Sequence, residues 1–167
     1  MSNILPSIVI LGTLAAVALF LTLSRDWGAR VDKTGTGGAV RIASFTVVAQ
    51  AAHFAEELFT GFPEKFPILF GLGPMSRAFF VSFNLAWIAV WSASIWGVGK
   101  KQRAALFPLW FLSLGCVANG LAHPLFSAFV GGYFPGLLTA PVVAVLGLVL
   151  LRRLVEITEP TIGTDLV

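Results

Sequence analysis

Three ionisable side chains, His53, Glu56 and Glu57, lie in a stretch that otherwise has the composition of a membrane-spanning helix. Residues three and four apart share a face of a helix, so His53 can act together with either glutamate. A charged group in hydrocarbon costs at least a few kcal/mol unless it is paired, protonated or bound to a metal. The cluster therefore predicts a buried functional site in which one of these compensations operates.

A second polar pair, Asn119 and His123, lies in another apolar segment, and its spacing of four places both side chains on one helix face. If one helix begins near Arg41 and the other near Ala104, Glu56 and Asn119 both lie roughly 22 Å along their helices. His123 lies one turn further. The polar groups are therefore expected to meet in one layer, in the outer half of a membrane.

The composition indicates an integral membrane protein. Of the 167 residues, 57% are hydrophobic and only 11% are charged, whereas a soluble domain has roughly 25% charged residues. The net charge of +3 does not indicate nucleic-acid binding, because the basic residues lie in short loops between apolar segments, where they set membrane topology. We expect no nucleic-acid partner. The single cysteine, Cys116, excludes an internal disulfide.

The expected fold is an all-α integral membrane bundle of about five transmembrane helices. A spanning helix needs about 20 mostly apolar residues. Five segments approach this requirement, at about residues 5–23, 39–62, 78–98, 104–126 and 134–151. Residues 1–155 are therefore predicted to form one transmembrane domain, and residues 156–167, with Asp165, a frayed polar tail.

The loop charges predict the orientation of the bundle. Basic residues gather in the loops after the first and third helices and at the end of the fifth, namely Arg25, Arg30, Lys33, Arg41, Lys100, Lys101, Arg103, Arg152 and Arg153. The opposite side has only Lys65 and Arg77. The positive-inside rule then places the N-terminus outside and the C-terminus in the cytoplasm. We expect a multi-pass protein of a bacterial inner membrane.

Prolines predict two irregular places near the polar layer. Residues 61–74 are apolar but contain three prolines and three glycines, so no regular helix is expected there. The loop 61–77 is then either a connector at the interface or a lid over the bundle. Pro124 directly follows His123 and is expected to break the fourth helix beside the polar side chains or to end it there.

Three short motifs in order resemble the pattern of the HXXEE domain family of membrane proteins. The motifs are His53-Phe-Ala-Glu56-Glu57, Asn119-Gly-Leu-Ala-His123 and Tyr133-Phe-Pro135-Gly136. Together they extend over most of the chain. The resemblance implies that the site of the family is formed by His53, Glu56, Glu57, Asn119, His123 and Tyr133. It implies little about the reaction, because the family is defined by its motifs.

One interpretation of the polar layer is a metal site. Imidazole and carboxylate groups are good ligands for zinc or iron, and a divalent metal would neutralise both glutamates. His53 and Glu57 would bind from one helix and His123 from another. Glu56 would be a fourth ligand or a general base that activates water. Asn119 would orient a ligand or the substrate.

A second interpretation is metal-free acid–base catalysis on a lipid-like or isoprenoid substrate. Burial can keep one of two neighbouring carboxyl groups protonated while the other accepts a proton. Both interpretations make the protein a membrane enzyme, with Glu56, Glu57, His53, His123, Asn119 and Tyr133 as its catalytic residues. The expected partners are lipids and a hydrophobic small molecule.

Two further interpretations involve no reaction. The glutamates could load and release an ion in a proton- or cation-coupled transporter, or in a membrane protein that binds a small molecule. The inner half of the fourth helix is apolar, however, which disfavours an ion pathway through one chain; a homo-oligomer remains possible. Alternatively, the polar groups only fix helix packing, although such contacts are usually worth about 1 kcal/mol or less.

Overall fold

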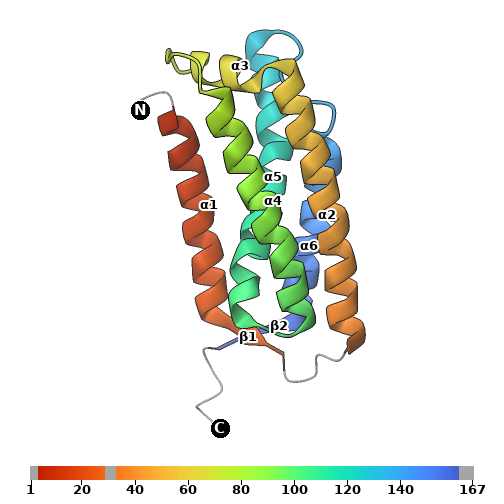
Figure 1. The fold of residues 1–167 in the computed structure, drawn as a ribbon. Helices are drawn as coiled ribbons and strands as arrows, with labels where there is room; N and C mark the ends of the chain where they lie inside the picture. The colour runs from red at the N-terminus through yellow and green to blue at the C-terminus, as the bar shows by residue number, and fades with distance from the viewer. Residues whose placement is uncertain (1–3, 29–32, 162–167) are drawn as a thin grey trace.

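The computed structural model describes residues 4–28 and 33–161, and in these residues the fold is a bundle of helices with two short strands (Figure 1). The helices are α1 (Leu5–Ser24), α2 (Lys33–Thr60), α3 (Phe62–Ile68), α4 (Arg77–Gly99), α5 (Leu106–Val130) and α6 (Ala140–Ile157). The long helices run along the length of the bundle, and α3 lies across one end (Figure 1). The all-α prediction is therefore confirmed for the described residues.

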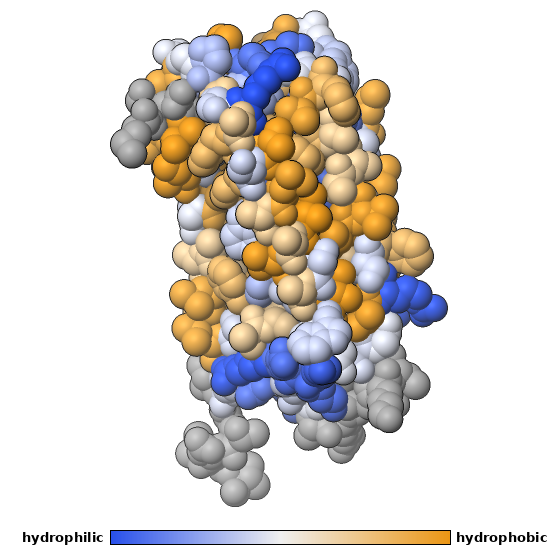
Figure 2. Space-filling view, viewed as in Figure 1, coloured by the Kyte–Doolittle hydropathy of each residue, from blue (hydrophilic) through white to orange (hydrophobic). Residues whose placement is uncertain are grey.

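Within the described part of the chain, three helical segments are long and apolar enough to cross a membrane: Leu5–Ser24, Arg77–Gly99 and Arg103–Val130. The expected spans in α2 and α6 are more polar, because α2 contains the His/Glu cluster and α6 ends in Arg152, Arg153 and Glu156. Both helices nevertheless expose apolar side chains such as Val48 and Val145. Figure 2 shows that apolar residues cover much of the middle of one face, between hydrophilic groups at both ends.

The end of the bundle opposite α3 is closed by a short antiparallel strand pair, β1 (Arg25–Trp27) with β2 (Thr158–Pro160). The Arg25 guanidinium donates to the Thr158 carbonyl at 2.7 Å and to its hydroxyl at 2.8 Å. The prediction of a frayed tail from residue 156 was thus wrong for residues 156–160, because α6 continues to Ile157 and the strand pairs with β1. Arg30, Asp165 and the Lys33 side chain lie outside the described residues.

The segment 62–68 is a helix, contrary to the expectation from its prolines. Pro63 occupies the first turn, where its missing N–H has no intrahelical partner to lose. Pro67 cannot donate to the Pro63 carbonyl one turn earlier, and the Met75 N–H donates to that carbonyl at 2.8 Å instead. A backbone donor from the following loop therefore satisfies the carbonyl that the second proline leaves unpaired.

The expectation that Pro124 breaks or ends its helix was also wrong, because α5 continues through this residue to Val130. Membrane-type helices tolerate proline where packing against neighbouring helices maintains the helix axis, and α5 packs extensively against α6. The helix ends instead at Gly131, which has a left-handed φ of 69°. A turn of residues 131–139 follows, so α6 begins at Ala140 rather than at residue 134.

Close contact between α5 and α6 depends on small residues. Gly120 faces Ala144, and a Cβ added at Gly120 would overlap the Ala144 Cβ. At Gly147 an added Cβ would lie 2.6 Å from the Cys116 Cβ and 2.9 Å from the Ser113 carbonyl oxygen. Such small residues allow helix backbones to approach closely in membrane proteins. The contact fixes α5, which carries His123, relative to the turn before α6.

We expect Gly147→Ala to destabilise the protein by about 1–3 kcal/mol, because its methyl group would press on the backbone of α5. Gly37→Ala in α2 is the matched control, since no atom lies within 4 Å of its added Cβ; it should be neutral or slightly stabilising. Thermal unfolding in detergent measures both. Equal unfolding temperatures for the two variants would contradict the close α5–α6 contact.

Candidate functional site

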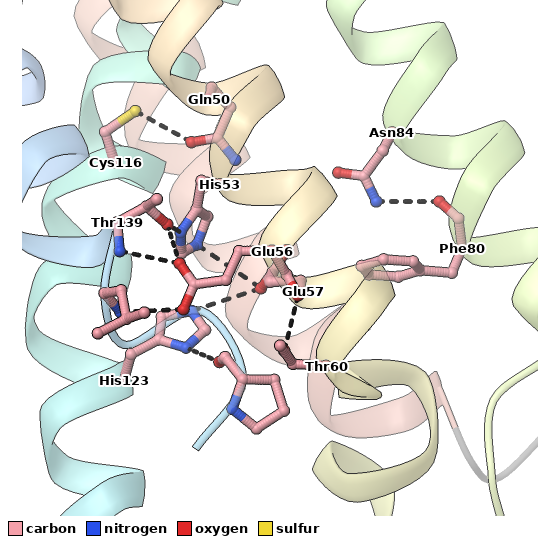
Figure 3. A network of polar contacts seen from close by, with 12 residues as sticks. Gln50, His53, Glu56, Glu57, Thr60, Phe80, Asn84, Cys116, His123 and Thr139 are labelled. Carbon is pink, nitrogen blue, oxygen red and sulfur yellow. Dashed lines mark hydrogen bonds and ion pairs between the residues drawn. The ribbon is translucent and has the colours of Figure 1, made fainter. Parts of the chain in front are cut away.

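The site forms where α2, α5 and the turn 131–139 meet, near the end of the bundle that α3 covers (Figure 3). His53 and Glu57 lie one turn apart on α2, and His123 faces them from α5. These side chains are 0%, 6% and 2% exposed, respectively. The structure thus brings together one residue of the Asn-x-x-x-His motif and two of the His/Glu cluster.

Three potential metal-ligand atoms converge in this site. Glu57 Oε1 lies 3.6 Å from His53 Nε2 and 3.4 Å from His123 Nε2. One ligand atom from each residue lies within 4.8 Å of the other two. The buried group His53, Glu57 and His123 could therefore hold a metal ion, as the sequence predicted for these three residues.

Hydrogen bonds on the far sides of the rings define the tautomers of both histidines. His123 Nδ1 lies 2.6 Å from the Pro135 carbonyl oxygen, which only accepts, so this nitrogen carries a proton. His53 Nδ1 lies 2.7 Å from the Thr139 hydroxyl, whose own proton is donated to Glu56. His53 Nδ1 must then also be a donor. In neutral imidazoles, both Nε2 atoms are left as lone-pair acceptors facing Glu57.

Glu56 turns away from this group and binds the turn 131–139. Its Oε1 accepts from the Tyr133 hydroxyl at 2.6 Å and the Leu138 N–H at 3.0 Å. Its Oε2 accepts from the Thr139 N–H at 2.9 Å and from the Thr139 hydroxyl. Four donors thus satisfy one carboxylate. Both Glu56 oxygens are engaged here. Glu56, the predicted fourth metal ligand, therefore does not join the metal-ligand group of His53, Glu57 and His123.

Tyr133 belongs to the hydrogen-bonded cluster around Glu56 and not to the group around Glu57. Its side chain is 43% exposed at the surface of the turn. Partial desolvation raises the pKa of the Tyr133 phenol, and the hydrogen bond to Glu56 acts in the same direction. The phenol therefore remains a neutral donor to Glu56 at physiological pH.

Gly136 explains why the turn can lie so close to the two imidazole rings. It adopts a left-handed φ of 90°, which glycine tolerates best. An added Cβ would lie 2.6 Å from His123 Nδ1 and 2.9 Å from His53 Cε1. The Tyr-x-Pro-Gly motif thus supplies a phenol for Glu56, a carbonyl for His123 and a residue small enough to contact both histidines.

An elongated cavity of about 460 Å³ reaches the site from one side. Glu57, His123 and Asn119 line it, together with Asn84 and many apolar side chains of α1, α4 and α5. A volume of this size is typical of small-molecule sites. Asn119, predicted as a site residue, therefore lies where it can contact a molecule in the cavity.

Aromatic rings cover the site from the end of the bundle. The ring of Phe62 in α3 lies 5.8 Å from that of His123, and Phe134 lies 6.2 Å from the same ring. Phe66 in α3 contacts Phe126 of α5 at 5.6 Å. The helix in the loop 61–77 therefore lies over the site, with its Phe62 ring beside His123.

Two functional residues in the turn were missed from the sequence. Thr139 connects Glu56 to His53, and the Pro135 carbonyl fixes the tautomer of His123. Assigning residues 134–151 to one helix concealed Thr139. The sequence Thr139-Ala-Pro141 is a typical helix start, because Thr is common before a helix and proline in its first turn.

Comparison with protein-family models, curated proteins and solved structures gives no match. The site must therefore be interpreted from its own geometry.

We expect Glu56→Gln to destabilise the protein by about 2–3 kcal/mol, because the amide nitrogen would face two donors in place of an acceptor. Glu64→Gln is the control: Glu64 accepts from Arg77 in an ion pair that is largely exposed, and such pairs contribute about 1 kcal/mol or less. Chemical unfolding in detergent compares the two. A Glu56→Gln protein as stable as Glu64→Gln would show that the four-donor cluster does not hold the turn.

Proposed function

We propose that this protein is a metal-dependent membrane enzyme that acts on a lipid-like substrate, with His53, Glu57 and His123 as the metal ligands. One observation carries the proposal: two imidazole Nε2 atoms and a carboxylate oxygen converge, and the Nδ1 hydrogen bonds leave both Nε2 atoms of the neutral rings as acceptors. His53 Nε2 is buried and has no hydrogen-bond partner among the described residues. A cation at this point removes the repulsion between the three acceptors.

The distances support a metal more than a shared proton. A charge-assisted hydrogen bond between imidazole and carboxylate has a length of about 2.7–2.9 Å, whereas the two distances here are 3.6 and 3.4 Å. Two ligands that are each about 2.0–2.1 Å from a tetrahedral zinc ion lie about 3.3–3.4 Å from one another. The two distances from Glu57 Oε1 to the histidine nitrogens are thus close to the spacing of ligands around one ion.

Three protein ligands suit a catalytic rather than a structural metal. Structural zinc sites usually have four protein ligands, while catalytic sites have three and leave a position for water or substrate. A bound metal would polarise a substrate oxygen or activate a water molecule. The Nδ1 hydrogen bonds of His53 and His123 to Thr139 and Pro135 are the outer contacts that orient metal-binding histidines.

Acid–base chemistry without a metal is a weaker candidate for this geometry. It requires a proton shared between Glu57 and a histidine, and both Nε2 atoms lie beyond hydrogen-bond length from the carboxylate. Ion transport is also less well supported, because the described lining of the cavity is apolar in the half far from Glu57, at Ala15, Trp91 and Phe111. An ion pathway through this half would lack polar groups.

The proposed enzyme is a multi-pass membrane protein, with α2 and α6 crossing the bilayer beside the three strongly apolar segments. The basic residues of β1, of the segment between α4 and α5, and of the end of α6 would face the cytoplasm, as in a bacterial inner membrane, and the N-terminus would lie outside. The site would then lie in the outer half of the bilayer. The exposed apolar faces of α2 and α6 support this arrangement.

The metal proposal predicts about one zinc or iron ion per chain in protein purified without chelators, measured by inductively coupled plasma mass spectrometry. His53→Ala and His123→Ala should each reduce the metal content about tenfold or more, because each removes one of three ligands. Glu64→Gln lies outside the site and should retain the wild-type content.

Metal content is compared only among variants that elute as the same species as the wild type on size exclusion. A His53→Ala protein that is folded and keeps its metal would contradict the assignment. So would wild-type protein that remains metal-free after incubation with zinc and with ferrous iron.

A further inference from the structure

The cavity beside the site is long and follows the helices. Its lining on α4 extends from Phe79 to Trp91, and on α5 from Phe126 past His123 to Phe111. The α4 interval and the part of α5 from His123 to Phe111 are each twelve residues, or about 18 Å at the rise of a helix. This length resembles the half-thickness of a bilayer's hydrocarbon core, about 15 Å.

The cavity is narrow for its length. Its volume of about 460 Å³, spread over about 18–23 Å, gives a mean cross-section of about 20–26 Å². A long space with a small section suits one extended hydrocarbon chain in van der Waals contact with the walls. The shape favours such a chain over a fused-ring skeleton or two chains side by side.

Polarity changes along the cavity in one direction. The polar side chains of the lining are Ser7, Glu57, Asn84, Asn119 and His123 in the half near α3, and Gln50 midway. The far half is lined by apolar and aromatic groups such as Leu112 and Phe111. A molecule that fits this gradient has a polar head at Glu57 and a hydrocarbon tail.

We propose that the cavity binds a single-chain amphiphile, with its head group at Glu57 and His123 and its hydrocarbon chain extended between α1, α4 and α5. This inference deepens the proposed function and rests on it, because the head group is placed at the metal ligands. The walls fix the length of chain that fits. In the proposed orientation the chain lies parallel to the lipids of the outer leaflet.

Access from the bilayer is easiest between α1 and α4. Both helices line the cavity, yet α1 packs mainly along α5 and makes few direct contacts with α4. Most of α1 is exposed, with only Ala18 and Thr22 buried. A chain can therefore enter sideways from the hydrocarbon, without its tail passing through water.

Two glycines leave the passage open about two thirds of the way from the head-group end. Gly115 on α5 lies eight residues from His123, and Gly12 on α1 lies eight residues from Ile4 at the upper end. Each is therefore about 12 Å from that end. An added Cβ at either glycine has no atom within 4 Å. A leucine at either position would fill the passage without a clash in the backbone.

The test is the binding of saturated fatty alcohols of increasing chain length to the protein in phosphatidylcholine nanodiscs, with empty nanodiscs as the partition control. In the wild type, binding in excess of the empty nanodiscs should increase with chain length, through contacts with the walls, until the chain fills the cavity. Gly115→Leu should end this rise at chains about one third shorter. Gly37→Leu, in open space on α2 and outside the cavity, should behave as the wild type.

Gly12→Leu blocks the passage from the opposite wall. It should reduce the longest accepted chain in the same way, so the test does not depend on one variant. The inference fails if both leucine variants bind all chain lengths as the wild type does, or if cholesterol binds as tightly as the longest alcohol.

The longest chain that the cavity accepts depends on its walls and not on the metal. If metal-free His53→Ala shows the same maximum chain length, the inference stands, even where metal analysis overturns the proposed chemistry. A metal-loaded protein with no chain limit keeps the metal site and overturns the inference.

Discussion

The turn 131–139 fixes the proton positions of both buried histidines, and the geometry of the site depends on these contacts. Oxygen atoms of Pro135 and Thr139 accept the two Nδ1 protons, which leaves both Nε2 atoms as acceptors beside Glu57. Glu56 holds the turn in place through four hydrogen bonds. The two adjacent glutamates therefore have different tasks: Glu56 organises the turn, and Glu57 faces the histidines.

This division explains how two carboxylates can lie in an apolar helix. The donors of the turn stabilise the Glu56 carboxylate where it borders the protein surface. Glu57 is buried beside the Nε2 atoms of His53 and His123, which are both acceptors. No donor among the described residues hydrogen-bonds to its carboxylate. Its burial is favourable only with a cation or a proton in the group, and the distances from the Glu57 carboxylate to the two histidine nitrogens favour the cation.

The sequence predicted the helical fold and the three buried residues of the metal-ligand group, because helical spacing determines which side chains share a face. It predicted less well where the backbone departs from average rules. Pro67 is accommodated because Met75, eight residues later, donates to the carbonyl left unpaired, and such a contact cannot be inferred from local composition. The separate roles of Glu56 and Glu57 depend on the path of the turn, which apolar content alone does not define.

The most direct test of the central claim is X-ray absorption spectroscopy at the metal edge of the purified, metal-loaded protein. The account predicts a first shell of nitrogen and oxygen ligands at about 2.0–2.1 Å, with the outer-shell scattering of two imidazole rings. His123→Ala, which binds the metal more weakly, is measured with excess metal, and its spectrum should lack the signal of one ring. A spectrum without imidazole scattering, or one unchanged in His123→Ala, would contradict the assignment of His53, Glu57 and His123 as a metal centre.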